Sequence, residues 1–559
     1  MSAPNLVQTD VLVVGAGPVG LALAVELRRR DIAVRLVDRA PTAASTSRAL
    51  GTQARTVEVF GMMGIPEDAL VPSVRVRAVN LLDGASPLAR IDIRATRPDR
   101  SYDGLLVMAQ ADTERVLTDR LQALGGSLDR GTELVDFARE DAGVGASLRT
   151  ESGVETLHAR FVVGCDGAHS TVRHRLAIPF AGKTYPQEFL LADCRIAWSR
   201  PPDEACIWLH PDGVFAAIPL PEPGMWRLLA DVARPGLPSV EPSLDLFARL
   251  MTERGGVAAA PLSDATWMSG FTINRRLVGR YREGRVFLAG DAAHIHSPAG
   301  AQGMNTGIQD AFNLGWKLAL AAQGRAAPGL LDTYGEERLP VAHGVLEGTD
   351  RGMRMAFARN PALRWARDRL IAGLADLGVA QTLIAEQISE LGVNYRRATL
   401  SRSDAPRRDA FDPAAPRPGD RAPDGHALAL PDGHPVSLFD LFTTGRWTLL
   451  LFAAPDHARR GGHELGVLAR LVSERLGDDV RSLVVLPRGS SPEARHWPTP
   501  TLLDANGELA QRLGVRGEAS VLVRPDGYLG PRASPVDDTA LWAALGRVFR
   551  PDLLHDARA

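Results

Sequence analysis

One stretch near the N-terminus constrains the fold more than any other part of the chain. Residues 10–20 read DVLVVGAGPVG, an apolar run that leads directly into Gly15, Gly17 and Gly20, and an Ala/Leu-rich segment follows. In a dinucleotide-binding βαβ unit the first glycine makes the tight turn, the second lets the backbone approach a pyrophosphate, and the third lets the helix pack on the strand. A second apolar run ends at Asp38, where an acid can bind a ribose hydroxyl. The pattern predicts a Rossmann-like α/β domain.

Two later segments repeat the arrangement of a strand that ends in a small residue and an acid. Residues 161–173 read FVVGCDGAHSTVR and place Asp166 after an apolar strand. Residues 285–317 begin with a short strand, break at Gly290-Asp291, and continue through a Gly-rich loop into a helix that we expect from about Asn305. Such a segment presents a carboxylate and free backbone N–H groups on one side. It suits a ligand with both hydroxyl groups and electron-rich carbonyl groups.

In this order, the three segments resemble the motifs of the single-component FAD-dependent aromatic hydroxylases, the group typified by p-hydroxybenzoate hydroxylase and phenol hydroxylase. The matching patterns are G-x-G-x-x-G, D-G-x-x-S-x-V-R, and G-D followed by P-x-G-x-Q-G-M-N-T-G. The resemblance covers residues 8–400. It implies a monooxygenase in which NADPH or NADH reduces FAD, and a C4a-hydroperoxide of the flavin transfers one oxygen atom from O2 to a small aromatic substrate.

The resemblance also implies which residues bind the cofactor. Asp291 is expected to bond the ribityl hydroxyls, and the backbone N–H groups of Met304 and Asn305 are expected to stabilise negative charge at the flavin N1/O2 edge. Arg48 is placed beside the pyrophosphate and the isoalloxazine, whereas a solvated surface position is the alternative for either Arg48 or Arg55. The implied cofactor-binding residues are Gly15, Gly17, Pro18, Val19, Gly20, Asp38, Arg39, Arg48, Gln110, Leu134, Asp166, Asp291, Pro298, Gly300, Gly303, Met304 and Asn305.

The middle of the chain changes from alternating strands and helices to short strands separated by turn residues such as Pro211-Asp212-Gly213. This pattern predicts an antiparallel sheet. Its aromatic residues are expected to be mostly core. In the resembling family, one face of this sheet covers the flavin and forms the substrate cavity, so we predict Trp208 and Phe215 as substrate contacts.

Chain order then gives an interleaved architecture. The predicted α/β fold combines a Rossmann-like FAD-binding domain, an antiparallel-sheet substrate domain inserted into it, and a C-terminal thioredoxin-like α/β domain. The predicted boundaries are 1–175 for the first part of the FAD-binding domain with a small antiparallel insertion at 71–105, 176–275 for the substrate domain, 276–400 for the second part and a helical segment, 401–420 for a linker, and 421–559 for the C-terminal domain.

The C-terminal unit carries the strand and helix pattern of a thioredoxin-like fold, but its chemistry must differ. A redox thioredoxin needs Cys-x-x-Cys after its first long strand, where the helix N-terminus activates the attacking thiolate. Here the stretch reads AAPDHARR, and residues 421–559 contain no cysteine. Thiol chemistry is therefore excluded for this unit, and a structural role or a homodimer contact is the remaining interpretation.

The composition limits the classes of binding partner that we expect for this chain. With a formal net charge of −2, a pI of about 6.7 and no long basic or acidic run, the sequence does not imply nucleic acid or an anionic membrane as a partner. Three cysteines are too few and too scattered for a disulfide framework or a thiolate metal site, and no metal site is predicted. No apolar run is long enough for a membrane span, so we expect a cytoplasmic protein.

One departure from the family bears on the substrate. Phenol hydroxylases of this family carry an acidic residue at the position of Leu50, where it deprotonates small phenols. Its absence favours a larger phenolic or quinoid substrate that is acidic by itself, such as an aromatic polyketide of antibiotic biosynthesis. The alternatives are a catabolic hydroxylase of a small phenol and a non-enzymatic flavin-binding redox sensor. The halogenase motif W-x-W-x-I-P and a paired-cysteine motif are both absent.

Overall fold

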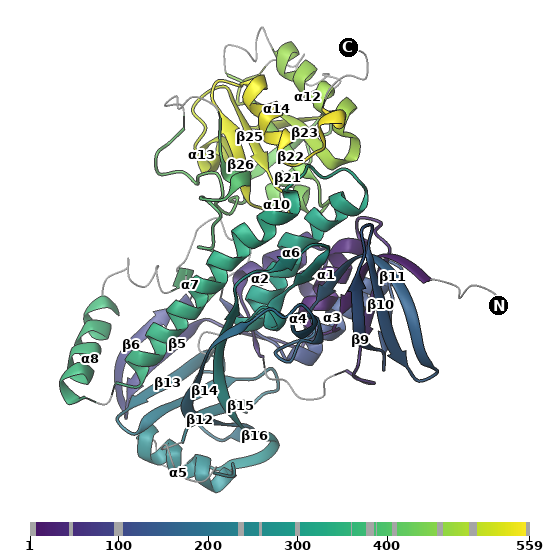
Figure 1. Cartoon of the computed structure of the whole chain (residues 1–559). Coiled ribbons are helices and arrows are strands. Elements are labelled where there is room, and N and C mark those ends of the chain that lie inside the picture. The colour runs from purple at the N-terminus through teal and green to yellow at the C-terminus, as the bar shows by residue number, and fades with distance from the viewer. Residues whose placement is uncertain are drawn as a thin grey trace.

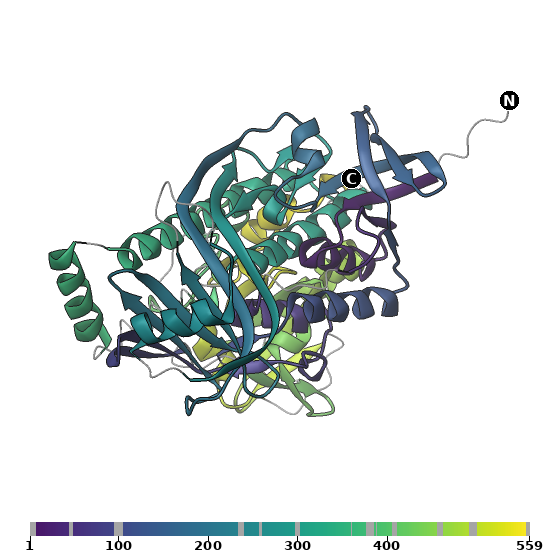
Figure 2. The same cartoon turned by 90° about the horizontal axis from the view of Figure 1, so that it is seen from below.

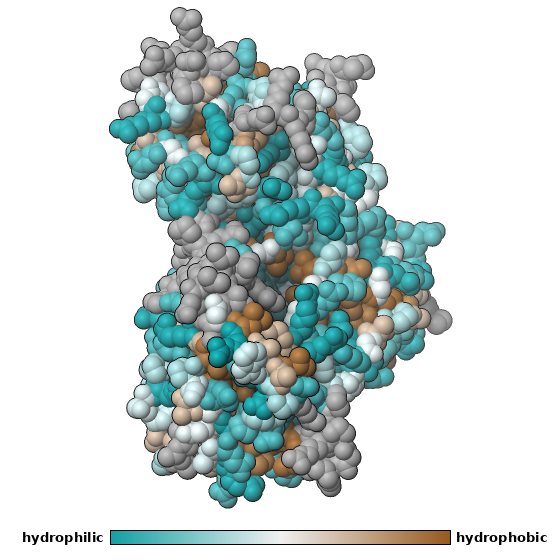
Figure 3. All heavy atoms as spheres, turned by 90° about the vertical axis from the view of Figure 1, so that its left-hand side faces the viewer, coloured by the Kyte–Doolittle hydropathy of each residue, from teal (hydrophilic) through white to brown (hydrophobic). Residues whose placement is uncertain are grey.

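The structure is a computed structural model in which three sheets form three lobes. It describes residues 7–43, 49–93, 104–232, 240–256, 260–296, 302–358, 360–375, 385–386, 388–404, 411–454, 462–490 and 500–554. The C-terminal domain forms the upper lobe in Figure 1, the substrate sheet lies at the lower left, and the N-terminal sheet lies at the right. On the face shown in Figure 3, hydrophobic side chains gather in the middle of the molecule, below the C-terminal lobe.

The N-terminal sheet is the predicted Rossmann-like sheet. Its order is β17-β18-β11-β1-β2-β8, and β10 and β9 continue antiparallel from β11. The pairs β1–β2, β1–β11, β11–β18 and β2–β8 are parallel, so these strands end at one edge. The strands are β1 Val7–Val14, β2 Val34–Asp38, β8 Leu128–Arg130, β9 Glu133–Arg139, β10 Val144–Thr150, β11 Gly153–Gly164, β17 Arg282–Glu283 and β18 Val286–Leu288.

Helices cover this sheet because its strands are apolar on both faces. Helix α1 (Pro18–Arg28) packs between α3 (Gln110–Ala123) and α6 (Gly303–Ala322), and its residues 21–25 are completely buried. A helix that is apolar all round needs neighbours on every side, and the Ala/Leu-rich sequence of α1 meets that condition. The other described helices of this half are α2 Ala54–Met62, α4 Thr171–Arg175, α7 Thr333–Ala356 and α8 Pro361–Ala375.

The substrate sheet has eight strands in the order β19-β16-β12-β15-β14-β13-β5-β6, and α5 (Leu244–Gly255) packs on one face of it. Its strands β12 and β16 are the longest, and they curve across the molecule when it is seen from below (Figure 2). The strands are β5 Ala78–Asp83, β6 Ser86–Asp92, β12 Phe180–Ile196, β13 Glu204–His210, β14 Gly213–Pro219, β15 Met225–Asp231, β16 Leu262–Val278 and β19 His294–Ile295.

The segment expected as a separate antiparallel insertion at 71–105 is instead divided between two sheets. Strands β5 and β6 form an antiparallel hairpin, but β5 pairs in parallel with β13 and so extends the substrate sheet. Strand β4 (Val74–Val76) joins β3 (Gly51–Thr52) and β7 (Leu105–Val107) in a three-stranded sheet. A parallel pairing between strands so distant in sequence leaves no local pattern, and the weak alternation of this segment could not reveal it.

The C-terminal lobe has a central sheet in the order β21-β20-β24-β23-β22-β25-β26. Parallel pairing of β22 with β23 and an antiparallel β25–β26 hairpin agree with the predicted strand and helix pattern, and the thioredoxin-like description stays a prediction. Its elements are β20 His426–Leu430, β21 Pro435–Ser437, α10 Leu438–Phe442, β22 Trp447–Phe452, α12 Gly462–Leu476, β23 Val480–Pro487, β24 Thr501–Asp504, α13 Glu508–Leu513, β25 Ala519–Val523, β26 Leu529–Ala533 and α14 Asp538–Gly546.

A buried ionic cluster joins this lobe to α6 and α7. Arg524, just after β25, donates to Glu337 of α7 at 2.6 and 2.8 Å and to Asp526 at 2.6 Å. Glu337 also accepts from Lys317 of α6 at 2.7 Å, and the side chains of all four residues are at most 2% exposed. Burial opposes the charge of Glu337, but Arg524 and Lys317 outweigh it and lower its pKa to about 2.

The same interface gives Arg55 a role that the sequence did not predict. Arg55 is 1% exposed, pairs with Glu58 at 2.9 Å, and donates to the Asp526 carbonyl at 2.7 Å. Glu58 is also held by Arg421 of the C-terminal lobe at 2.6 Å. The sequence left open whether Arg48 or Arg55 lies at a solvated surface position. Arg55 does not, because it is buried. Over the part of the chain that the structure describes, no helix has the length and apolar character needed to cross a membrane.

Candidate functional site

Four strand ends meet at one edge of the N-terminal sheet. Because β18, β11, β1 and β2 are parallel neighbours, the residues that follow them are brought together in the order in which the strands lie. Asp291 follows β18, Asp166 follows β11, Gly15 follows β1, and Asp38 ends β2. The topology therefore brings the three predicted segments to one edge, which is where ligands bind in open α/β sheets.

The three glycines of the first motif have different local duties. Gly15 has a φ of 98°, and a Cβ on it would lie 2.4 Å from the carbonyl oxygen of Cys165. A Cβ on Gly20 would lie 1.9 Å from the Gly15 carbonyl oxygen, so both positions need glycine for close packing of turn, strand and helix. A Cβ on Gly17, in contrast, would meet nothing within 4 Å. The backbone at Gly17 is therefore open on the side where a ligand phosphate can approach.

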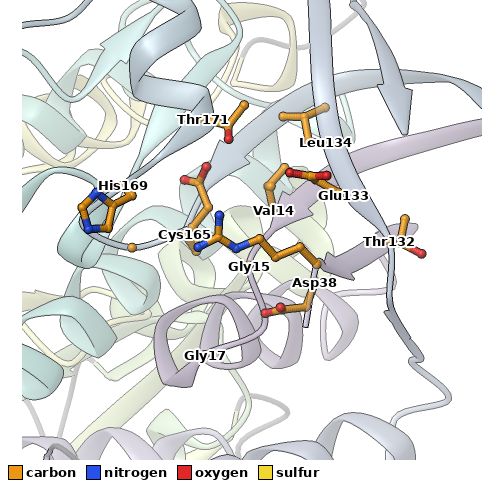
Figure 4. A pocket seen from close by; sticks show the side chains of 13 residues that line it. Val14, Gly15, Gly17, Asp38, Thr132, Glu133, Leu134, Cys165, His169 and Thr171 are labelled. Carbon is orange, nitrogen blue, oxygen red and sulfur yellow. The ribbon is translucent and has the colours of Figure 1, made fainter. Parts of the chain in front are cut away.

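Asp38 is held at the mouth of a cavity beside this turn. Its Oδ2 accepts from the backbone N–H of Ala16 at 2.6 Å, and its Oδ1 accepts from that of Ala40 at 2.8 Å. Each carboxylate oxygen keeps a second lone pair for a hydroxyl donor. The cavity measures about 260 Å³, and Figure 4 shows Asp38, Gly15, Gly17 and Leu134 around it. Its lining residues are Val14, Gly15, Gly17, Asp38, Arg39, Thr132, Glu133, Leu134, Cys165, Asp166, Gly167, His169 and Thr171.

Asp166 lines the same cavity with an unsatisfied oxygen atom. Its Oδ2 accepts from the Val172 N–H at 3.1 Å, whereas its buried Oδ1 has no hydrogen-bond partner within the described part of the chain. Burial raises the pKa of this carboxyl. Ser170 caps the short helix α4 by accepting from the Arg173 N–H, and Arg173 donates to the Ala292 carbonyl at 2.9 Å. The second motif is thus tied directly to the third.

Val19 joins the first motif to the third. A Cβ on Gly290, which has a φ of 60°, would lie 2.8 Å from a methyl group of Val19, and a Cβ on Gly307 would lie 2.6 Å from the same methyl group. The turn at Gly290–Ala292 and the first turns of α6 therefore pack directly on the first turn of α1. In this turn Asp291 is exposed, so its carboxylate lies at the surface of the assembled edge.

The N-terminus of α6 lies next to this turn. Helix α6 begins at Gly303, two residues before the start that we predicted near Asn305. The side chain of Gln302, the residue before the helix, makes no capping hydrogen bond. The Asn305 side chain is already engaged, because it accepts from the Gln53 N–H at 2.9 Å and donates to the Gly51 carbonyl at 2.8 Å. Asn305 thus fixes β3 and the start of α2 against α6. The predicted anion-stabilising role concerns the backbone N–H groups of Asn305 and Met304, and it stays a prediction.

The sequence of the chain matches the FAD binding domain family over residues 8–349. It is 35% identical over 551 residues to 6-methylpretetramide 4-monooxygenase of Streptomyces rimosus, an alignment that covers 96% of this chain and 93% of the relative. It is also 32% identical to pentachlorophenol 4-monooxygenase of Sphingobium chlorophenolicum, with 94% of this chain and 93% of the relative covered. The chain belongs to the FAD-dependent aromatic monooxygenases. The resemblance inferred from the three motifs is confirmed.

A solved structure of the family supports the fold over almost the whole chain. The ternary complex of aklavinone-11 hydroxylase with FAD and aklavinone has a TM-score of 0.77 and 29% sequence identity, and the match covers 97% of this chain and 99% of that one. The mixed α/β fold is therefore confirmed as that of the FAD-dependent hydroxylases. The C-terminal lobe lies within the matched length, so it is shared with that enzyme.

The structure places most of the predicted cofactor residues at the assembled edge. Leu134 is 2% exposed and lines the cavity. Arg39 also lines the cavity, but this residue is exposed. Gln110 begins α3 and donates to Glu114 at 2.9 Å. The negative charge of Asp38 contributes to raising the pKa of Glu114, so the two carboxyl groups lie near each other. Three predicted residues lie outside the described residues, namely Arg48, Pro298 and Gly300. The assignment of each residue to the cofactor stays a prediction.

Trp208 and Phe215 lie on the other side of the substrate sheet from the one we expected. Both are completely buried, their ring centroids are 5.5 Å apart, and they share a hydrophobic cluster with Phe247 of α5. They therefore form the core between the sheet and α5. The opposite face carries Phe189 and Phe271, whose rings are stacked at 5.8 Å beside α7. Alternation along a strand says that two faces exist but not which one a helix covers.

Two groups of residues were missed by the sequence analysis. The first group lines the cavity and consists of Thr132, Glu133, Cys165 and Thr171. Their closeness in sequence to the predicted residues Leu134 and Asp166 could have indicated them. Burial raises the pKa of the Cys165 thiol well above its usual value, so this cysteine stays protonated.

The second group is a buried hydrogen-bonded cluster behind the third motif. Asp310 of α6 pairs with Arg338 of α7 at 2.6 Å and with His294 of β19 at 2.7 Å, and its carboxylate accepts from the Gly290 N–H at 3.2 Å. Burial opposes the charge of Asp310, but Arg338 and His294 outweigh it and lower its pKa. No short motif marks this cluster, because its members come from separate elements.

Proposed function

We propose that this chain is an NAD(P)H-dependent monooxygenase that uses FAD and O2 to hydroxylate a phenolic aromatic substrate of the polycyclic polyketide type. The observation that carries the proposal is the assembled sheet edge, where Gly17 has an open backbone and Asp38 and Asp166 line one cavity. The open glycine and the unpaired Asp166 oxygen fit a ligand with a pyrophosphate and hydroxyl groups. When bound, FAD supplies hydride acceptance from NAD(P)H and activation of O2 for oxygen transfer.

The residues of this chain would bind and orient the cofactor. Asp38 would accept from ribose hydroxyls, because its two oxygens are already positioned by backbone donors. The turn at Gly15 and Gly17 would hold the pyrophosphate at the N-terminus of α1. Asp291 would bond ribityl hydroxyls, and the N-terminus of α6 would stabilise negative charge on the flavin ring.

The substrate class is supported by one residue and by the relatives. Leu50 is 8% exposed and packs in a small apolar cluster, so a base is missing where small-phenol hydroxylases carry one. A phenol that ionises by itself does not need that base. Relatives acting on 6-methylpretetramide and bound to aklavinone favour a polycyclic substrate. A small phenol is the second candidate, because pentachlorophenol 4-monooxygenase is also a relative.

The test is a substrate panel with the FAD-loaded protein. Phenol, pentachlorophenol and a series of hydroxylated anthraquinones and tetracyclic phenols would be incubated with NADPH or NADH in air. We expect polycyclic phenols to stimulate both NAD(P)H oxidation and O2 consumption and to yield a product heavier by one oxygen atom. Stimulation by the small phenols alone would favour the second candidate, and no hydroxylated product from any compound would contradict the proposed function.

A pair of variants tests the assignment of the cofactor site. Asp291→Ala removes an exposed carboxylate that we assign to the ribityl hydroxyls, so the purified protein should be colourless and largely free of FAD. Asp212→Ala removes another exposed carboxylate, 72% accessible, in a turn of the substrate sheet, and should stay yellow. The measurement is flavin absorbance per protein after gel filtration. Full flavin content in Asp291→Ala would contradict the assignment.

A further inference from the structure

A buried carboxyl group lies behind the first two turns of α6. Glu390 is 4% exposed, and its φ of 56° is one that residues other than glycine rarely adopt. Its Oε1 accepts from the Thr306 hydroxyl at 3.0 Å, and its Oε2 accepts from the Gln309 side-chain amide. Both donors belong to α6, and Thr306 lies within one turn of the helix start at Gly303. The strained backbone of Glu390 is therefore held by contacts with the helix that begins at the proposed flavin edge.

The charged groups around Glu390 are paired with one another. Asp310, on α6, is bonded by Arg338 of α7 and by His294 of β19. Arg338 uses its remaining donors on the Thr306 carbonyl at 2.9 Å and on a tyrosine hydroxyl. Among the described residues, no ion pair within 4 Å is formed by Glu390. Its carboxyl group is thus bonded by two neutral donors, whereas its neighbour Asp310 is bonded by the Arg338 guanidinium and by the His294 ring.

Two further titratable groups near Glu390, a tyrosine and a glutamate, are each held in one protonation state. The tyrosine bonded by Arg338 is Tyr395, on the segment that follows Glu390, and burial raises its pKa well above the usual value. Glu337, next to Arg338 on α7, is ionised and paired with Arg524. Glu390 is the exception. Burial raises its pKa to about 7, and the hydrogen bonds from Thr306 and Gln309 and the charge of Arg338 only partly oppose this effect.

We propose that Glu390 is a proton-coupled positioning residue of the flavin site, which takes up a proton when the flavin is reduced and releases it when the flavin is reoxidised. The inference rests on the proposed function, which places the flavin N1/O2 edge at the N-terminus of α6. Both the extra negative charge of the reduced ring and the charge of Glu390 would lie at the start of this helix. In a buried environment, two such negative charges repel each other more strongly than they would in water.

The step balances in charge and protons. In the proposed reaction, hydride transfer from NAD(P)H would add two electrons and one proton to the bound flavin, whose ring would then carry one negative charge more. The Glu390 carboxylate accepts one proton from water and becomes a neutral carboxylic acid that still accepts from the amide of Gln309. Reoxidation reverses the uptake. Above about pH 7, reduction would thus consume one proton beyond the one delivered as hydride, and Glu390 would keep the net charge near α6 constant.

The experiment compares the flavin midpoint potential of the FAD-loaded wild type and the Glu390→Gln variant as a function of pH. The slope against pH gives the number of protons taken up per two electrons. Above about pH 7, where Glu390 is ionised before reduction, we expect two protons in the wild type and one in Glu390→Gln. Below about pH 6, where Glu390 is already neutral, the slopes of the two proteins should agree. The amide replaces a neutral carboxyl of the same shape, so folding should be retained.

The matched control is Glu114→Gln. Glu114 is also a buried carboxyl group whose pKa burial raises, and it also accepts from a side-chain amide, but it lies on α3 beside Asp38. Its variant should keep the slope of the wild type. A second measurement needs no variant, since NADPH reduction of the wild type without O2 in weak buffer should bind close to one proton per flavin at about pH 8.

The outcomes separate the two proposals. Equal slopes in the wild type and Glu390→Gln, or no proton uptake by the wild type, would overturn the role of Glu390 while leaving the monooxygenase assignment intact. A protein that binds no flavin, or whose flavin NAD(P)H does not reduce, would overturn the proposed function itself. A reduced slope in Glu114→Gln as well would assign the effect to general loss of buried carboxyl groups and would also contradict the specific role of Glu390.

Discussion

The glycine turn and the charge clusters around α6 hold the same edge of the N-terminal sheet in different ways. At the turn, contacts are made by the backbone: Gly15 and Gly20 allow close approach, and Asp38 is positioned by two N–H groups. Around α6, contacts are made by long side chains from separate elements, as in the pairs of Asp310 with Arg338 and Glu337 with Arg524. The glycine turn depends on the absence of side chains at Gly15 and Gly20. The clusters around α6 depend on the pairing of buried carboxylates with buried cations.

The two regions should therefore fail differently. Adding a methyl group at Gly15 or Gly20 creates a steric conflict of known position. Removing one partner from a charge cluster instead leaves a buried charge with less compensation. The clusters also connect the three lobes, since Arg524 and Arg421 come from the C-terminal lobe. On this view the C-terminal lobe is part of the support of α6 rather than an independent appendage, and the following variants examine that difference.

The largest effect is expected from Arg524→Met. The substitution keeps an unbranched apolar stem but leaves Glu337 and Asp526 without their shared cation, and loss of one partner of a buried pair costs about 3–5 kcal/mol. Chemical denaturation at pH 7 should show this loss in the free energy of unfolding. The matched control, Arg512→Met, removes a partly exposed helical pair with Glu508, which is worth at most about 0.5 kcal/mol. Equal losses in the two variants would contradict the distinction drawn here.

A smaller loss of stability is expected from Gly20→Ala. The added Cβ would lie 1.9 Å from the Gly15 carbonyl oxygen, so α1 must shift away from β1, at a cost of about 1–3 kcal/mol for overpacking. Gly344→Ala is the control, because Gly344 lies inside α7 and a Cβ there meets nothing within 4 Å. That variant should be neutral or more stable, since alanine favours helix. Thermal unfolding of the flavin-free proteins measures both.

The pH dependence of stability separates Glu390 from the ionised members of the clusters. A carboxyl group whose pKa rises from 4.5 in the unfolded chain to about 7 in the fold favours folding only while it is protonated. Its charging should cost the wild type about 3 kcal/mol between about pH 4.5 and pH 8. Glu390→Gln lacks this cost, so its stability relative to the wild type should increase as the pH rises through about 7. A constant difference in the free energy of unfolding would show that Glu390 does not titrate in this range.

Sequence analysis predicted the first region well because its signals are local. The three glycines, Asp38 and Asp166 occupy fixed positions next to their own strands, and parallel pairing then brings them together without further information. The family and the mixed α/β fold follow from the same patterns. What these patterns do not contain is the partner of a residue that is far away in sequence, and Arg55 shows this, since its carbonyl partner belongs to Asp526.

The substrate sheet shows what the sequence pattern could not predict. Strand periodicity places Trp208 and Phe215 on one face with Phe189 on the other, but the choice between the faces depends on where α5 and α7 pack. The parallel pairing of β5 with β13 is hidden for the same reason. Glu390 lies within the predicted helical segment, yet nothing local indicates that its carboxyl group reaches Thr306. Tertiary contacts, rather than propensities, decide all three.

The smallest effect is expected from Gly17→Ala, and it is confined to the cofactor. Gly17 has a φ of −73°, which alanine adopts readily, and its Cβ would point into open space, so the flavin-free protein should unfold like the wild type. The same methyl group would occupy the path of the pyrophosphate, and FAD affinity should fall by at least about tenfold, or 1.4 kcal/mol. Titration of flavin-free protein with FAD, followed by flavin fluorescence, measures the change. If Gly17→Ala instead lost stability and kept its FAD affinity, Gly17 would belong with Gly15 and Gly20 as a packing residue, and the pyrophosphate would have to bind elsewhere.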